Sequence, residues 1–155
     1  MKEMFKIGLD LSIYAHLKDK KTGVESTIEI AYWRKAYSIR NMLVNVAEKY
    51  SVPSPYNYGD IQIYCRTAAL DEIIENLIRE LTNIDSPYWT DAIWDAEETR
   101  ETTLTNLNNL LIFRDWLVGK CETEFMLTHC FELYDTSDCG KRNQYEVCLE
   151  ILNSY

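Results

Sequence analysis

Apolar and polar residues alternate along residues 5–17 of this chain. Every second side chain is apolar up to Leu17, and most of the positions between them are polar. An alternation of period two over this length predicts a half-buried β-strand. The polar segment 18–23 predicts a turn, and residues 27–33 return to an extended pattern. Together the two runs predict a β-hairpin.

From Trp33 onward the apolar spacing becomes that of a helix. Apolar residues recur at helical spacing over residues 36–50 and again over residues 70–81. Such stripes predict two amphipathic helices that each turn one face to a core. Residues 61–65, between them, predict a short strand.

A long helix is predicted after Ser86. Serine at the cap and Pro87 at the first helical position are typical of a helix start. The apolar stripe that follows continues to about residue 118. Because a helix over residues 87–118 would be unusually long, a kink near residues 99–103 is also consistent with the pattern.

The C-terminal part predicts a late strand near residues 123–134 and a last helix over residues 143–152. Strands and helices do not alternate strictly, so the pattern favours the α+β class over a doubly wound sheet. We expect a single domain over residues 1–155. In it, a small antiparallel sheet, made of the N-terminal hairpin and the late strand, packs against about four helices, including the long one.

The chain carries a formal net charge of −9. Nucleic-acid binding depends on cations that displace counterions, so this charge argues against direct contact with nucleic acid. Net negative charge instead suits solubility or attraction to a basic partner. No apolar run is long enough to span a membrane and no signal-peptide pattern is present, so we expect a cytoplasmic protein without membrane contact.

Cysteine, histidine and glycine usage argues against several kinds of site. The five cysteines are odd in number and form no C-x-x-C pair, which speaks against a disulfide framework or a zinc site. The two histidines, His16 and His129, lie in no metal-binding motif, and the five glycines form no phosphate-binding loop. We therefore expect no metal and no cofactor, and we recognise no catalytic motif.

One candidate site lies where the hairpin turns into the first helix. Cations in the first turn of a helix favour an anion, and an aromatic ring beside them can stack on a base. A nucleotide-type ligand could therefore be held by Trp33, Arg34, Lys35, Tyr37 and Arg40. In the alternative interpretation, Trp33 belongs to the core and the cations balance acidic neighbours.

A second candidate is a row of carboxylates at helical spacing, formed by Asp91, Asp95, Glu98 and Glu101. Carboxylates along a helix can imitate a phosphate backbone and occupy the basic groove of a partner protein. Equally, such a row can be the solvated face of a helix.

A third candidate is the polar side of the first strand, where Asp10, Ser12, Tyr14 and His16 share one face. Such a row can be catalytic, but no nucleophile motif surrounds it, and polar residues that face water explain it equally well. An enzyme is the expectation only if His16 or His129 lies within hydrogen-bond reach of a carboxylate or thiol in a deep cleft.

The N-terminal third resembles a family of small phage and prophage proteins. Its members begin with a Gly-Leu-Asp strand and carry a Tyr-Trp-Arg-Lys-Ala helix entry. The matching residues are Gly8, Leu9, Asp10, Tyr14, Tyr32, Trp33, Arg34, Lys35, Ala36, Ile39, Asn41 and Val44. The chain departs from the family pattern at Tyr37, Arg40, Met42 and Leu43. The family supplies no established activity.

These observations lead to two expectations of function. The first is a non-enzymatic phage-type accessory protein that binds and inhibits a host defence protein, with acidic surfaces that mimic nucleic acid. Its partner would be a host protein, such as a basic nucleic-acid-binding one. The alternative is a sponge that sequesters a nucleotide signal in the pocket of arginines and aromatics. Long amphipathic helices and exposed aromatic residues also allow a homodimer.

Overall fold

The computed structural model describes residues 10–19, 21–52, 62–92, 95–117 and 145–154. In chain order the elements are β1 (Asp10–Asp19), β2 (Glu25–Arg34), α2 (Tyr37–Lys49), β3 (Gln62–Cys65), α3 (Ala68–Leu81), α4 (Pro87–Thr90), α5 (Ala96–Leu117) and β4 (Tyr145–Ser154). The predicted α+β class is confirmed.

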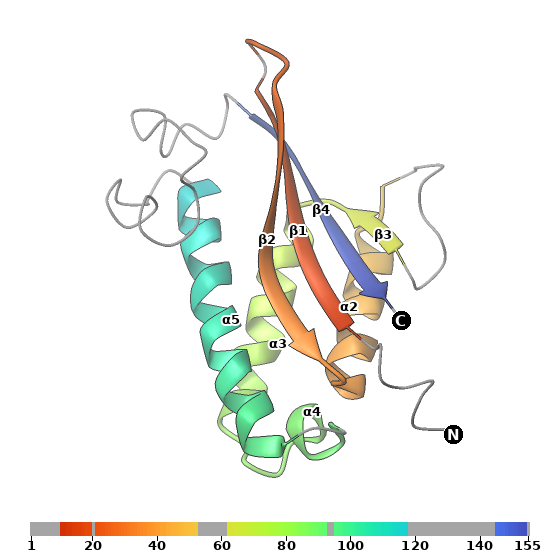
Figure 1. Ribbon diagram of the computed structural model, residues 1–155, viewed down its shortest axis with the longest axis vertical. Helices are drawn as coiled ribbons and strands as arrows, with labels where there is room; N and C mark the ends of the chain where they lie inside the picture. The colour runs from red at the N-terminus through yellow and green to blue at the C-terminus, as the bar shows by residue number, and fades with distance from the viewer. Residues whose placement is uncertain (1–9, 20, 53–61, 93–94, 118–144, 155) are drawn as a thin grey trace.

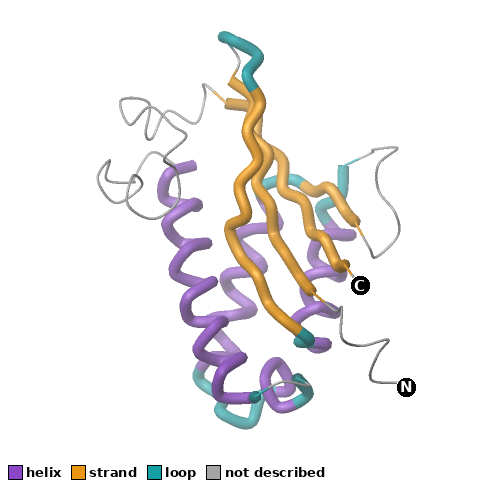
Figure 2. The backbone as a smooth tube through the Cα atoms, viewed as in Figure 1, coloured by secondary structure: helices purple, strands orange, loops and turns teal. Residues whose placement is uncertain are grey.

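Within the described residues, the strands form one antiparallel sheet of four strands in the order β2-β1-β4-β3. The helices α2, α3 and α5 lie on one side of this sheet, as Figure 1 and Figure 2 show. We call the opposite side the open face, because no described helix covers it. The hairpin of β1 and β2 extends past the ends of the helices (Figure 1).

The strand β4 replaces the last helix that was predicted over residues 143–152, so this prediction is wrong. In this short segment Val147, Leu149 and Ile151 alternate as in a strand, although its apolar residues also fit a helical stripe. Pairing with all ten residues of β1 decides between the two patterns, and Leu149 and Ile151 are buried. The late strand predicted near residues 123–134 lies outside the described residues.

A β-bulge keeps the apolar residues of β2 on the helix side of the sheet. Ile13 pairs with Ala31 but Tyr14 pairs with Glu29, so Ile30 is the extra residue. Without it, strict alternation would turn Ala31 and Trp33 to the face opposite Ile28. The extra residue shifts the alternation by one position, so that Ile28, Ala31 and Trp33 all point to the helix side. All three side chains are buried.

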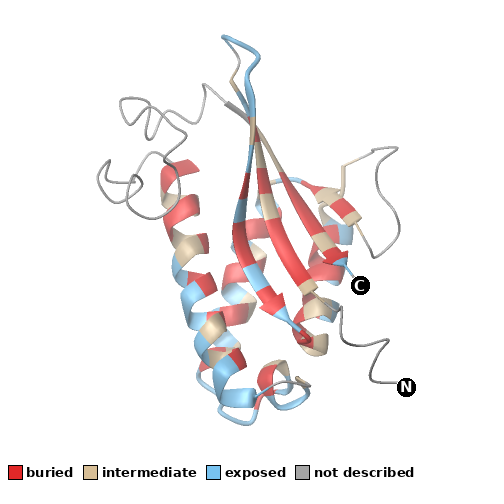
Figure 3. Ribbon diagram, viewed as in Figure 1, coloured by how far each residue is buried: buried red, intermediate tan, exposed pale blue. Residues whose placement is uncertain are grey.

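The core lies between the sheet and the helices, and Figure 3 shows the buried residues gathered there. Its largest fully buried side chains include Trp33, Trp89 and Phe113. The helices α2 and α3 confirm the two predicted amphipathic helices, and each turns an apolar face to this core. None of the described helices combines the length and the hydropathy that a membrane span requires.

The long helix predicted over residues 87–118 is interrupted. The start at Ser86 is confirmed, because its hydroxyl accepts the Tyr88 N–H at 3.2 Å and Pro87 is the first helical residue. However, α4 ends at Thr90 and α5 begins at Ala96. A carboxylate, described below, caps this second start. Residues 99–103, where the sequence allowed a kink, lie inside α5.

The central position of β4 makes a direct prediction. We expect Ile151→Ala to lower the free energy of unfolding by about 2–5 kcal/mol, because it leaves a cavity in the core. Urea unfolding followed by circular dichroism measures this. Ile84→Ala is the matched control, since Ile84 is 72% exposed. Equal effects of the two substitutions would contradict the buried position of Ile151.

Candidate functional site

The open face carries the polar side chains of β1 together with those of its neighbours. Asp10, Ser12, Tyr14 and His16 share this face, as the alternation predicts. The Tyr32 hydroxyl donates to Asp10 at 3.0 Å, and the Ser12 hydroxyl donates to a Glu29 carboxylate oxygen at 3.0 Å. The face is therefore linked across strands by side-chain hydrogen bonds.

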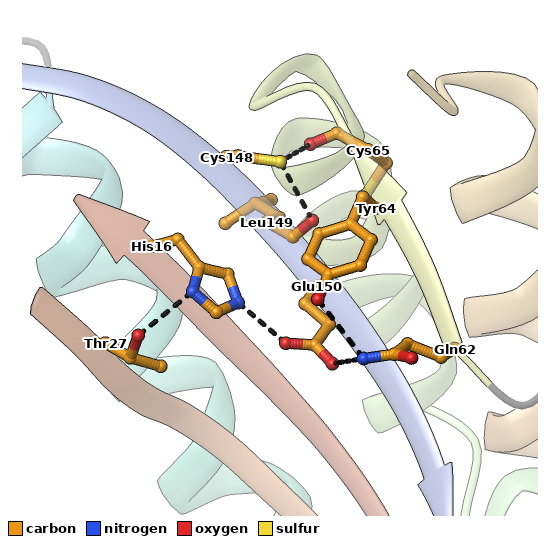
Figure 4. Close-up of polar contacts among 8 residues, drawn as sticks. All are labelled: His16, Thr27, Gln62, Tyr64, Cys65, Cys148, Leu149 and Glu150. Carbon is orange, nitrogen blue, oxygen red and sulfur yellow. Dashed lines mark hydrogen bonds and ion pairs between the residues drawn. The ribbon is translucent and has the colours of Figure 1, made fainter. Parts of the chain in front are cut away.

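A continuous chain of hydrogen bonds crosses the four strands of the described sheet (Figure 4). On β2, the Thr27 hydroxyl lies 3.0 Å from His16 Nδ1, on β1. His16 Nε2 lies 2.6 Å from Glu150 Oε1, on β4. The Gln62 amide, on β3, donates to Glu150 Oε2 at 2.6 Å and also contacts the Tyr64 hydroxyl at 3.2 Å. We call these five residues the polar belt.

Strand register explains why these side chains meet. His16 pairs with Thr27 on one side and with Cys148 on the other, while Tyr14 pairs with Glu150. His16 and Glu150 are therefore diagonal neighbours on the open face, a spacing that long side chains can bridge. The belt follows from the pairing of β1 with both of its neighbours.

Glu150 is the most buried member of the belt, with 6% of its surface exposed. A carboxylate removed from water is costly unless donors replace the lost solvent. His16 and Gln62 supply those donors, one to each oxygen. The belt thus holds the carboxylate in one orientation.

The partners of His16 define its proton positions. An ionised carboxylate only accepts, so His16 Nε2 carries a proton and donates it to Glu150. In the neutral imidazole, Nδ1 then has no proton and accepts from the Thr27 hydroxyl. In this tautomer of the neutral ring, Nδ1 is placed to take a proton from Thr27.

A cleft of about 500 Å³ lies at the hairpin end of the sheet, and its lining includes His16, Lys18, Thr27 and Cys148. The thiol of Cys148 contacts the Cys65 carbonyl oxygen at 3.6 Å. Burial raises the pKa of the Cys148 thiol, and it raises the pKa of the Cys65 thiol to about 12. Both thiols are therefore protonated near neutral pH and are poor nucleophiles.

The five residues of the predicted nucleotide pocket differ in their exposure to solvent. Trp33 is fully buried, and its indole N–H donates to the Thr103 hydroxyl at 3.0 Å. Lys35 is also buried and has a φ of 55°, at the turn from β2 into α2. Arg34 is exposed, whereas Tyr37 and Arg40 are half-buried on α2.

The start of α2, where the sequence predicts an anion, already holds one from the chain itself. The Ser38 N–H donates to the Asp91 carboxylate at 3.4 Å, and the Ser38 hydroxyl donates to its other oxygen. A carboxylate at this position compensates the positive end of the helix. Asp91, predicted to contact a partner, is therefore an internal capping group.

The other three residues of the predicted carboxylate row include one more capping group and two exposed side chains. Asp95 caps α5, because its side chain accepts the Glu98 N–H at 3.0 Å. Glu98 and Glu101 are exposed on the first turns of α5. Of the four carboxylates, these two are the ones that face solvent without a capping role in the described structure.

A small groove joins parts of the two predicted sets. It has a volume of about 240 Å³ and lies between the end of β2 and the start of α5. Tyr32, Trp33 and Arg34 line one side, and Glu98, Thr99 and Thr102 line the other. The groove brings Arg34 and Glu98, from different candidate sites, to one place on the surface.

Asn106 of α5 binds the outer edge of β2, a contact that sequence reasoning missed. Its amide donates to the Tyr32 carbonyl oxygen at 2.7 Å, and its carbonyl oxygen accepts the Tyr32 N–H at 3.2 Å. The Asn106 side chain thus forms the two backbone hydrogen bonds that a neighbouring strand would form with Tyr32. The signal was a polar stripe of Thr99, Thr103 and Asn106 at helical spacing. These three residues are buried, whereas the apolar Leu104 is 49% exposed.

Among the described residues, no group of three or more His, Cys, Asp or Glu side chains is arranged to hold a metal ion. His129 and three of the cysteines, Cys121, Cys130 and Cys139, lie outside the described residues.

Comparison of this chain with models of protein families, with curated proteins and with solved structures gives no match. The resemblance of the N-terminal third to phage proteins stays a prediction.

The contact of Asn106 with β2 can be tested against a neighbour in the same helix. We expect Asn106→Leu to lower the free energy of unfolding by about 1–3 kcal/mol, because it leaves the backbone of Tyr32 without its partner. Asn108→Leu is the control, since Asn108 is exposed on α5. If chemical unfolding shows the two variants to be equally stable, Asn106 does not protect the edge of β2.

Proposed function

We propose that this protein acts by binding the basic surface of another protein and masking it. The contact surface lies around Tyr32, at the junction of the open face and the start of α5. We define the acidic rim as Asp10, Glu29, Glu98 and Glu101 together with Tyr32 at its centre.

The position of Tyr32 is the observation that carries this proposal. Its side chain is 39% exposed and its hydroxyl is fixed by the hydrogen bond to Asp10. Its ring lines the groove opposite Glu98. Burial, together with the bond to Asp10, raises the pKa of Tyr32, so the hydroxyl remains a neutral donor. A half-exposed aromatic ring held in one orientation is typical of a residue that anchors a protein interface.

The charge around Tyr32 favours a basic partner. Glu29, Glu98 and Glu101 are exposed and Asp10 is half-buried, whereas Arg34 is the cation that lines the same groove. Carboxylates on a surface attract cationic partners and speed their encounter, and salt screens this attraction. The net charge of −9 adds a field of the same sign.

The phage-type resemblance extends this proposal to the identity of the partner. Under that resemblance, the partner is a host defence protein, and a basic nucleic-acid-binding protein fits the acidic rim. The alternative function, a nucleotide sponge, has less support. Two of its five residues, Trp33 and Lys35, are buried, and Asp91 accepts from the helix start that a phosphate would use.

Charge reversal in the acidic rim tests the proposal. Tagged wild-type protein and the variant Glu98→Lys/Glu101→Lys are used as baits in host extracts, and captured proteins are identified by mass spectrometry. We expect a basic protein that binds the wild type, is lost from the variant, and is released as the salt concentration rises.

Glu75→Lys is the control, because Glu75 is an exposed carboxylate on α3 that is not part of the rim. This variant is expected to capture the partner as the wild type does. Equal capture by the rim variant would contradict the proposed surface. A large rise in the melting temperature with a nucleotide, and no captured protein, would instead favour the sponge.

A further inference from the structure

Three members of the polar belt have the arrangement of a nucleophile, a base and an orienting acid. The Thr27 hydroxyl oxygen lies 3.0 Å from His16 Nδ1, and His16 Nε2 lies 2.6 Å from Glu150. A hydroxyl beside an imidazole that a carboxylate orients is the general pattern of an activated nucleophile. We propose that Thr27 is an acyl-acceptor site, activated by His16, which Glu150 positions.

The tautomer of His16 supports this proposal. Because Nε2–H donates to Glu150, Nδ1 is the basic nitrogen, and it is the one that meets the Thr27 hydroxyl. As the proton moves to Nδ1, the imidazole becomes a cation beside the carboxylate. Glu150 then stabilises the charge that develops, as the acidic member of a catalytic triad does.

Glu150 is held firmly enough for this role. Its second oxygen accepts from the Gln62 amide at 2.6 Å, and only 6% of its surface is exposed. A carboxylate that cannot rotate keeps the imidazole in one plane. Glu150 is thus a positioning residue, since the carboxylate acts through the imidazole and has no part in bonding to the acyl group.

Access and charge also suit the reaction. Thr27 is exposed, and it lines the cleft of about 500 Å³ together with His16 and Lys18. An acyl ester can therefore reach the hydroxyl from solvent. Lys18, an exposed cation, also belongs to the lining of this cleft.

The chemical step can be written with an activated ester of a small carboxylic acid. Thr27 Oγ1 attacks the carbonyl carbon and its proton passes to His16 Nδ1. The tetrahedral intermediate collapses, the ester C–O bond breaks, and the alcohol part leaves with the electron pair. His16 then releases its proton to solvent, and Thr27 carries the acyl group as an ester. The step modifies the protein once and needs no turnover, so it goes beyond the binding function.

Labelling with p-nitrophenyl acetate tests the proposal. Release of p-nitrophenolate gives the rate, and peptide mass spectrometry locates the acetyl group. We expect Thr27 to be acetylated about 10²-fold faster than Thr22, an exposed threonine in the hairpin turn that does not contact His16, the histidine among the described residues. Hydroxylamine should remove the label, because it cleaves an ester and leaves an acetylated lysine intact.

Variants separate the chemical role from a structural one. Thr27→Val should abolish the labelling at position 27 and the fast release of p-nitrophenolate, with an unchanged melting temperature. His16→Gln should slow Thr27 labelling about 10²-fold. Glu150→Gln should change the pH dependence of labelling. If Glu150→Gln does not fold, the Thr27→Val variant still tests the proposal. Labelling of Thr27 no faster than Thr22, or an unchanged fast phase in Thr27→Val, would overturn the proposal.

Discussion

The antiparallel pairing of β1 with β4 is the interaction on which the rest of the structure depends. It joins residues as distant as His16 and Glu150, which are 134 positions apart in the chain. It places the C-terminal strand between β1 and β3, so that β3 joins the described sheet through β4. Closing so long a loop costs conformational entropy before any contact repays it, so we expect this pairing to form late in folding.

The same pairing organises both faces of the sheet. On the helix side it buries Leu149 and Ile151, and on the open face it brings Glu150 to His16. A slip of one residue would turn Glu150 into the apolar core and Leu149 to the open face. Because a buried carboxylate without donors is so unfavourable, the polar belt specifies the register as well as the site chemistry. Fold and candidate site are thus two consequences of one alignment.

The parts of the fold with a strict period could be predicted from the sequence. The alternation in β1 fits only a strand, and the apolar stripe of α3 fits only a helix. The polar row from Asp10 to His16 follows from the alternation. The strand β4 could not be predicted, because a short apolar segment fits two periods and only its pairing decides. The partner of His16 depends on that pairing. The polar stripe around Asn106 was missed because a pattern of apolar residues cannot reveal a helix that docks on a strand edge.

Nuclear Overhauser contacts between β1 and β4 test the central claim most directly. The account predicts cross-strand contacts in one register, in which Ile13 faces Ile151 and Tyr14 faces Glu150. Backbone amide and Hα protons of the two strands would report it, with slow amide exchange along both. Sequential helical contacts over residues 145–154, or contacts shifted by one residue, would contradict the pairing and with it the polar belt.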